Sequence, residues 1–298
     1  MSKPRFGVSG STILSNPEQF DELFWEDIDL IEIGEFPHET AFRTFLDLCK
    51  VKQIPFGVHS PLLRNGSKYD LLEKVSFEPL IARKELEKEA ELLSRLGAQY
   101  ILVHFPYFKS ETTEPVNEMI ETGLQELCRI QNKYGIPIIC EPKLGIGRSA
   151  KGIQYLDSFP VEIWERYSLK LCIDIGDYLI ATGDEIVKYV EKWKEYIKIV
   201  HVHNVTYEDG KYIWIPVHPS HENNGKQYKL AHIIRFLSQC KDIHFIFEHT
   251  PHSNPSKEFV QQGYIWTRDI VMSSLANRSS FQISQCESGI GRTNGGQC

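Results

Sequence analysis

The chain has 298 residues, a formal net charge of -7 and 41% hydrophobic residues. This length and composition suit one large globular α/β domain with a full core and exclude a small disulfide-stapled fold. The acidic balance disfavours polyanion binding unless basic residues gather locally, and the basic residues in expected loops are Lys109, Lys143, Arg148 and Lys226.

Short apolar runs alternate along the chain with longer helical patterns. The runs span residues 5–9, 29–33, 55–59, 100–104, 137–141, 170–174, 198–203 and 244–248. The helical patterns span residues 17–26, 38–50, 77–96, 115–134, 153–167, 184–194, 228–239 and 257–274. Most runs are apolar on both faces, as parallel strands covered by helices require. Eight strands alternating with eight helices predict an α/β protein with one (β/α)8 TIM barrel, over residues 1–276, rather than an open doubly wound sheet.

The C-terminal segment 277–298 is rich in Ser, Gly and Gln and has no apolar periodicity. It predicts a disordered tail, and the alternative is a short segment packed on the barrel. The chain has no run of 18 apolar residues and no apolar segment near its start, so we expect neither a membrane span nor a signal peptide. Seven cysteines without a Cys-x-x-Cys pair favour free thiols, a reducing compartment and hence a cytoplasmic location.

Residues able to bind a divalent cation end six successive expected strands. They are His59, His104, Glu141, Asp174, His203 and Glu248. Each alone has an ordinary explanation, a core or surface histidine or an inter-strand ion pair. A barrel, however, brings these ends to one mouth, where unpaired imidazoles and carboxylates would cost several kcal/mol. The pattern therefore predicts bound cations, and this ligand set suits Zn, Mn or Fe better than Ca.

Strand seven carries two histidines that face the same side, because they alternate along the run. His203 lies nearer the carboxyl end and is the expected ligand, whereas His201 is a residue behind the ligands or a substrate contact. Asp177, three residues after Asp174, is either a further ligand or a helix cap.

Two polar loops follow the expected ligand strands. The segment EPKLGIGRS (141–149) has glycines at 145 and 147, where a ligand can approach the backbone or the chain simply turns. Its Lys143 and Arg148 are candidate substrate contacts, although Lys143 is expected to be exposed. The loop 215–225 carries His218 and His221, whose default interpretation is solvated histidines.

These motifs resemble the xylose-isomerase-like barrels and, among them, the abasic-site endonucleases of the endonuclease IV family. The resemblance covers most of residues 5–270 as strand order. Individual residues match only in short motifs, which are GVHSPLL, ILVHFP, EPKLGIGRS, LCIDIGDYLIATGDE, HVHN and FIFEHT.

The resemblance implies a site of up to three ions with specific ligands. His59 and His104 would hold the first ion, and Glu141 would bridge it to a second. Asp174, His203 and Glu248 would complete the second site, and His218 would belong to a third, also touched by Glu248.

Several positions depart from the endonuclease pattern. Asp177 replaces a histidine ligand and Pro216 replaces an aspartate ligand, which puts the third ion in doubt. Leu62 and Leu63 stand where the family has an aromatic and an apolar residue that enter DNA, so the stacking aromatic is missing.

Three functions therefore remain open. The first is a zinc- or manganese-dependent hydrolase of DNA repair that cleaves phosphodiester bonds at abasic sites. The second is a sugar or sugar-phosphate isomerase or epimerase that uses one Mn or Mg ion, with Glu141 and Glu248 as acid and base. The third is a barrel that binds a ligand or partner without catalysis. The number of bound ions, one to three, discriminates best between the first two.

Overall fold

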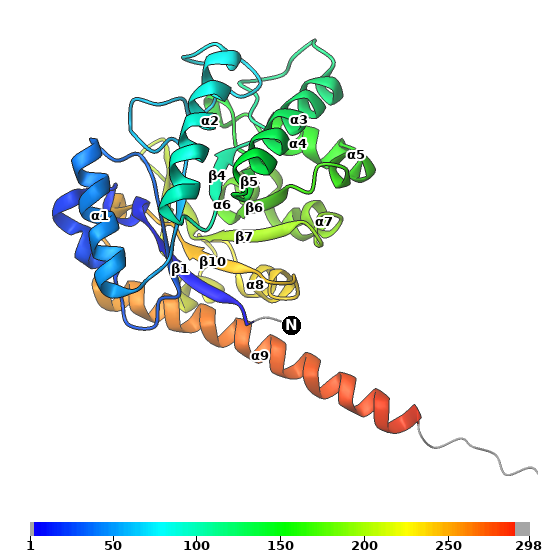
Figure 1. The fold of residues 1–298 in the computed structure, drawn as a ribbon. Helices are drawn as coiled ribbons and strands as arrows, with labels where there is room; N and C mark the ends of the chain where they lie inside the picture. Colours follow the sequence, from blue (N-terminus) through cyan, green and yellow to red (C-terminus); the bar gives the residue numbers. More distant parts are fainter. Residues whose placement is uncertain (1–2, 290–298) are drawn as a thin grey trace, which may run out of the picture.

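Eight parallel strands close into a barrel surrounded by helices (Figure 1). The computed structural model describes residues 3–289, with side chains up to residue 276. The barrel strands are β1 (Arg5–Ser9), β2 (Leu30–Ile33), β3 (Phe56–His59), β4 (Ile101–His104), β5 (Ile138–Glu141), β6 (Lys170–Asp174), β7 (Ile197–Val202) and β10 (His244–Phe247). Each strand pairs in parallel with its neighbours in chain order, and β10 closes the ring against β1. The predicted (β/α)8 barrel is confirmed.

Helices cover the outer face of the barrel. They are α1 (Glu39–Lys52), α2 (Pro79–Leu96), α3 (Val116–Tyr134), α4 (Lys151–Ser158), α5 (Val161–Glu165), α6 (Ile175–Thr182), α7 (Ile186–Glu191), α8 (Ala231–Leu237) and α9 (Lys257–Gly289). A main apolar core lies between these helices and the strands. Among the described helices, none combines the length and the apolar character that crossing a membrane requires.

A second apolar cluster fills the inside of the barrel. Its members are Leu30, Tyr100, Leu102, Ile139, Cys172, Ile199 and Ile246. The ring of Tyr100 occupies space that a side chain on β3 would otherwise take, since a Cβ on Gly57 would lie 2.3 Å from its Cζ atom. Glycine at position 57 therefore allows an aromatic ring inside the barrel.

Three predicted elements differ from the structure, and one element was not predicted. The pattern at 17–26 forms the 3-10 helix η2 (Pro17–Leu23), and the pattern at 153–167 divides into α4 and α5 because Pro160 stands between them. The pattern at 184–194 shortens to α7, preceded by α6, which directly follows β6. An unpredicted antiparallel hairpin, β8 (Asn204–Glu208) and β9 (Lys211–Ile215), follows β7.

Helix α9 extends past the barrel at its C-terminal end (Figure 1). Residues 277–289, expected to begin a disordered tail, are helical in the structure. Adding turns to an existing helix costs far less than nucleating a new one, so a polar segment can continue a docked helix. The rest of the expected tail, 290–298, lies outside the described residues.

Candidate metal centre

The carboxyl ends of the strands bring the expected ligands to one mouth. His59, His104, Glu141 and Asp174 are the last residues of β3, β4, β5 and β6. Glu248 directly follows β10, and His203 directly follows β7. Strand register places His104 opposite Glu141 and Asp174 opposite His201. Parallel pairing thus aligns the donors at the same level of the barrel.

Two histidines and a shared carboxylate form one possible metal site. The Nε2 atoms of His59 and His104 lie 3.2 Å apart, and each lies within 3.3 Å of Glu141 Oε2. The ring of Tyr69 stacks on His104 with centroids 4.9 Å apart. Burial lowers the pKa of His104 well below its usual value, which keeps this imidazole neutral. A neutral imidazole is the form that binds a metal.

A second group of donors lies beside the first and shares Glu141. One ligand atom each from Glu141, Asp174, His201 and Glu248 lies within 4.8 Å of the others. His201 Nδ1 is 2.5 Å from Glu248 Oε2 and 3.3 Å from Glu141 Oε1. His201, expected behind the ligands, therefore lies among them.

His203 contacts the same aspartate from the other side. Its Nε2 atom lies 2.8 Å from Asp174 Oδ1, and its Nδ1 atom lies 3.2 Å from the carbonyl oxygen of Asn204. A Cβ on Gly176 would lie 2.2 Å from His203 Cε1, so the start of α6 leaves room for this ring. The structure thus places His203 beside the four-residue group, within reach of Asp174.

Lys143 is buried among carboxylates, which corrects the expectation that it is exposed. Its ammonium lies 3.0 Å from Glu141, 2.9 Å from Asp174 and 2.7 Å from Asp177, and the side chain is 16% exposed. Burial favours neutral lysine, but the three acids outweigh it and hold the pKa of Lys143 well above its usual value. The Lys143 side chain lies against the strand ends because the three carboxylates there attract its ammonium group.

Asp177 lies in the first turn of α6 and does not cap it. Asp174 caps this helix, since its Oδ1 accepts a hydrogen bond from the backbone N–H of Asp177 at 2.9 Å. Burial and the neighbouring Asp174 raise the pKa of Asp177 to about 6. Asp177 therefore adds negative charge beside Lys143 at the edge of the second group.

The residues present fit a divalent cation. Glu141 Oε2 faces the ring nitrogens of His59 and His104, and Asp177 Oδ1 is buried without a hydrogen-bond partner among the described residues. Burial disfavours ionised Glu141, but Lys143 and His201 hold the pKa of this carboxyl well below its usual value. Transition metals bind ionised carboxylates together with neutral imidazoles, and Mg²⁺ prefers the carboxylate oxygens.

An open cavity of about 980 Å³ gives access to these groups. Its lining includes His59 and Glu248 from the strand ends, together with Ser9, Arg64 and Lys68. The Ser9 hydroxyl donates to Glu248 Oε1 at 3.2 Å. Polar and charged side chains therefore surround the entrance, as a hydroxyl-rich or phosphorylated ligand requires.

The remaining expected site residues are not members of the two donor groups. His218 stacks on Phe259 of α9, and its ring nitrogens face Ser220 and Gln262 at 2.7 and 3.0 Å. His221 is buried, with its Nδ1 atom 3.3 Å from the side-chain nitrogen of Asn204. The guanidinium of Arg148 lies 4.2 Å from the ring centroid of Trp214 in β9.

Sequence reasoning missed Glu32, which lies fully buried behind the second group. Its Oε1 is 2.8 Å from His201 Nε2, and its Oε2 accepts a hydrogen bond from the Tyr100 hydroxyl at 2.8 Å. The available signal was a charged residue in the middle of the apolar run DLIEI, since a fully buried carboxylate requires partners.

A family model named for xylose isomerase-like TIM barrels matches residues 19–270. The chain belongs to this xylose isomerase-like TIM barrel family. A search of curated proteins finds no match. Three solved structures that match the chain share 13–16% identity with it, so they show the architecture alone.

These three structures cover almost the whole barrel of this family member. A D-tagatose 3-epimerase-like protein shares 16% identity, with a TM-score of 0.62, and the match covers 90% of this chain and 99% of that one. The 3-keto-D-glucoside 4-epimerase of E. coli has 14% identity, a TM-score of 0.60 and coverages of 90% and 100%. A D-psicose 3-epimerase, solved in the presence of D-fructose, has 13% identity, a TM-score of 0.59 and coverages of 90% and 99%.

Proposed function

We propose that this chain is a divalent-metal-dependent epimerase or isomerase of a small sugar or sugar phosphate. The observation that carries the proposal is the group of Glu141, Asp174, His201 and Glu248, whose donor atoms lie within 4.8 Å of one another at the mouth of the barrel. The structural neighbours are named as a D-tagatose 3-epimerase-like protein, a D-psicose 3-epimerase and a 3-keto-D-glucoside 4-epimerase, and these names support a sugar substrate more strongly than DNA.

In this proposal the four residues hold one ion, Mn²⁺ or Mg²⁺. When bound, the ion polarises the carbonyl and hydroxyl oxygens of the sugar as a Lewis acid. Lys143 keeps Glu141 and Asp174 ionised, and the Ser9 hydroxyl orients Glu248. The chain itself therefore supplies fixed carboxylates in a largely water-excluded site.

Glu141 and Glu248 are the proposed acid and base. Glu141, kept ionised by Lys143, takes the proton from the carbon beside the sugar carbonyl; the pair of the broken C–H bond forms a C=C bond and the π pair of the carbonyl moves onto its oxygen, which gives an enediolate. Glu248 takes part in its protonated form and gives its proton to the same carbon from the opposite face, which inverts the configuration, and a proton exchange with solvent restores both groups. Return of the proton to the neighbouring carbon would instead interconvert ketose and aldose. General acid–base catalysis of this kind contributes about 10²–10⁴-fold.

Deuterium exchange tests the proposal directly. The protein, supplied with Mn²⁺ in D₂O, is incubated with D-fructose, D-tagatose or D-psicose and with their phosphates, and NMR follows the label beside the carbonyl. We expect label incorporation and an epimer or isomer of at least one sugar. Glu248→Gln should abolish exchange, whereas Glu39→Gln, an exposed residue of α1, should leave it unchanged. Absence of exchange across the whole panel would contradict the proposal.

A second candidate, cleavage of DNA at abasic sites, has one observation in its favour. His59, His104 and Glu141 form a further donor group that shares Glu141 with the first, and two adjacent ions can activate water and stabilise a leaving oxygen. Cleavage of a duplex with a tetrahydrofuran abasic analogue, in Zn²⁺ or Mn²⁺, tests it. His218, expected to hold a third ion, belongs to neither group and stacks on Phe259 of α9, which makes this the weaker candidate.

A further inference from the structure

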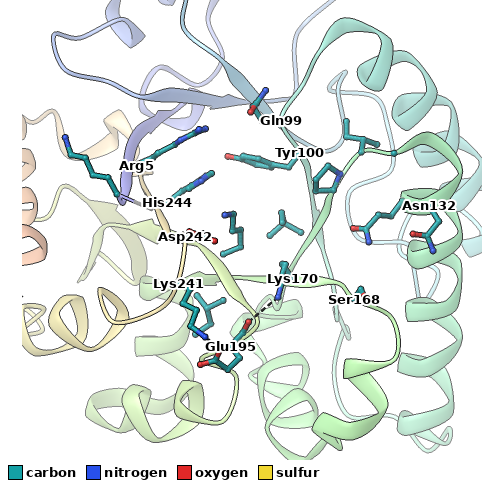
Figure 2. A pocket seen from close by; sticks show the side chains of 18 residues that line it. Arg5, Gln99, Tyr100, Asn132, Ser168, Lys170, Glu195, Lys241, Asp242 and His244 are labelled. Atoms are coloured by element: carbon teal, nitrogen blue, oxygen red, sulfur yellow. Dashed lines mark hydrogen bonds and ion pairs between the residues drawn. The ribbon is translucent and has the colours of Figure 1, made fainter. Parts of the chain in front are cut away.

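A second cavity lies at the amino-terminal end of the barrel, opposite the proposed active site (Figure 2). Its volume is about 1010 Å³. Arg5, Lys170 and His244, which line it, are the first residues of β1, β6 and β10. Cavities of about 300–1,000 Å³ are typical of small-molecule sites. The amino-terminal end of such barrels usually serves stability, so an open polar cavity there is unexpected.

The lining of this cavity is basic although the chain is acidic. Two carboxylates and five cationic side chains line it, the latter being Lys3, Arg5, Lys170, Lys198 and Lys241. Glu195 pairs with Lys241 at 3.1 Å, which leaves Asp242 as the only other acid among the lining residues. The local charge is therefore positive, against a net charge of -7 for the whole chain.

The cations at this end repel one another. Lys198 is half-buried on β7, and its pKa is lowered first by burial and then by Arg5 and Lys170, although Asp242 opposes the shift. Like charges gathered in a partly desolvated place destabilise the folded chain. Lys170 donates to the carbonyl oxygen of Glu195 and Lys241 pairs with its carboxylate, but five cations face two acids here, and a bound anion would reduce the remaining repulsion.

His244 provides an independent sign of a missing partner. The residue is 8% exposed and lines the cavity, and its Nδ1 atom is buried without a hydrogen-bond partner among the described residues. Burial, with Lys198 and Arg5 beside it, lowers the pKa of His244 to about 3, so the ring is neutral at pH 7. In Figure 2 its ring lies beside Arg5 and Tyr100, toward the middle of the cavity. A neutral imidazole with an unused nitrogen can donate one hydrogen bond to a ligand.

We propose that this cavity binds a phosphate-bearing small molecule. Arg5, Lys170 and Lys198 supply the positive charge, and His244 Nδ1 supplies a neutral hydrogen bond. Arginine and lysine are the usual protein groups for phosphate, and the half-buried setting of Lys198 strengthens its contact. The ligand binds at the end of the barrel opposite the donor groups, so this site is separate from the proposed sugar site and does not depend on that function.

Calorimetry on the full chain tests this site. Inorganic pyrophosphate is titrated at low salt with EDTA present, which keeps divalent metals out of the other end of the barrel. We expect one pyrophosphate per chain, with affinity reduced at least tenfold in Lys198→Met and in Arg5→Gln. Lys84→Met, which removes an exposed lysine of α2, should bind as the unaltered protein does. Adenosine monophosphate and glucose 6-phosphate, compared with adenosine and glucose, then show which organic part is accepted.

A loss of pyrophosphate binding in Lys198→Met can be attributed to the cavity, because this substitution should not unfold the protein. Loss of one member of a repelling cluster should leave the ligand-free melting temperature unchanged or raised. If Lys198→Met nevertheless fails to fold, Arg5→Gln decides alone, since Arg5 is exposed. No pyrophosphate binding by the unaltered protein, or equal binding by the cavity variants and Lys84→Met, would overturn the proposal.

Discussion

Glu32 Oε1 lies 2.8 Å from His201 Nε2 inside the barrel, and both side chains are fully buried. The other ring nitrogen of His201 faces Glu248 and Glu141. A carboxylate in this position accepts a hydrogen bond from Nε2–H, which directs the lone pair of Nδ1 toward the metal group. Tyr100 holds the second oxygen of Glu32, so the carboxylate cannot turn away.

The first prediction follows from this contact. Glu32→Gln keeps the size of the side chain but removes the negative charge that selects the tautomer of His201. We expect Mn²⁺ affinity, measured by calorimetry, to fall about 10–100-fold, as is usual when such a partner of a metal-bound histidine is lost. Tyr100→Phe should have a smaller effect in the same direction. Glu39→Gln serves as the matched control, and unchanged affinity in Glu32→Gln would exclude the tautomer role.

Lys143 carries the second prediction, because it balances three buried carboxylates in the metal-free protein. Lys143→Met leaves these acids uncompensated, which should lower the free energy of unfolding in EDTA by about 3–5 kcal/mol. Mn²⁺ should restore much of this loss and should bind the variant more tightly, since the competing ammonium is gone. Urea unfolding with EDTA and with Mn²⁺ measures both effects.

Lys151→Met is the control for Lys143, because Lys151 pairs with the exposed Glu111 and should change little. A variant at position 143 that is equally stable with and without Mn²⁺ would show that the three acids do not form a cation site.

The number of ions per chain separates the two candidate functions. The sugar reaction needs one exchangeable ion in the group with Asp174 and His201, whereas phosphodiester cleavage needs a further ion at His59 and His104. We expect elemental analysis of the Mn-loaded protein to give one tightly bound ion, and His104→Ala to keep it. Two or three ions, with His104→Ala losing one, would instead support the hydrolase, and no bound ion would support a barrel without catalysis.

The strands and most strand-end donors could be predicted from the sequence. Runs such as ILVH and IICE are apolar on both faces and end in a polar residue. The same runs therefore predicted both the barrel strands and the residues at its carboxyl-terminal mouth. Asp174 and Glu248 were identified because parallel register alone brings such ends to one level. No long-range packing detail was needed for either conclusion.

The rest of the site depends on side-chain conformations, which a sequence pattern does not encode. Lys143 has a long flexible chain, and its position among the acids is decided by charge rather than by periodicity. His201 and His203 share one face of β7, so only the packing around Glu32 and Gly176 shows what each ring touches. His218 was assigned by resemblance, and the sequence pattern gives no sign that its ring stacks on Phe259 of α9.

The last prediction concerns Asp70, which organises the segment that holds Tyr69 over His104. Its Oδ1 accepts hydrogen bonds from the backbone N–H groups of Val75, Ser76 and Phe77 at 2.6–2.8 Å. Burial opposes ionisation of Asp70, but these donors lower its pKa below the usual value. A carboxyl with a lower pKa in the folded state stabilises the protein above the unfolded-state pKa of about 3.9, and this contribution disappears as the pH falls through the folded-state value.

Asp70→Asn should therefore lower the free energy of unfolding at pH 7 by about 2–3 kcal/mol, since hydrogen bonds to a charged acceptor are replaced by weaker ones. The difference between the variant and the unaltered protein should shrink as the pH is lowered below about 4. Urea unfolding between pH 7 and pH 3 measures it, and Asp47→Asn, at an exposed position of α1, is the control. Acid protonates Asp70 and so weakens its hydrogen bonds in the unaltered protein. A difference in unfolding free energy that stays constant with pH would therefore mean that packing, rather than the ionised carboxylate, holds the segment.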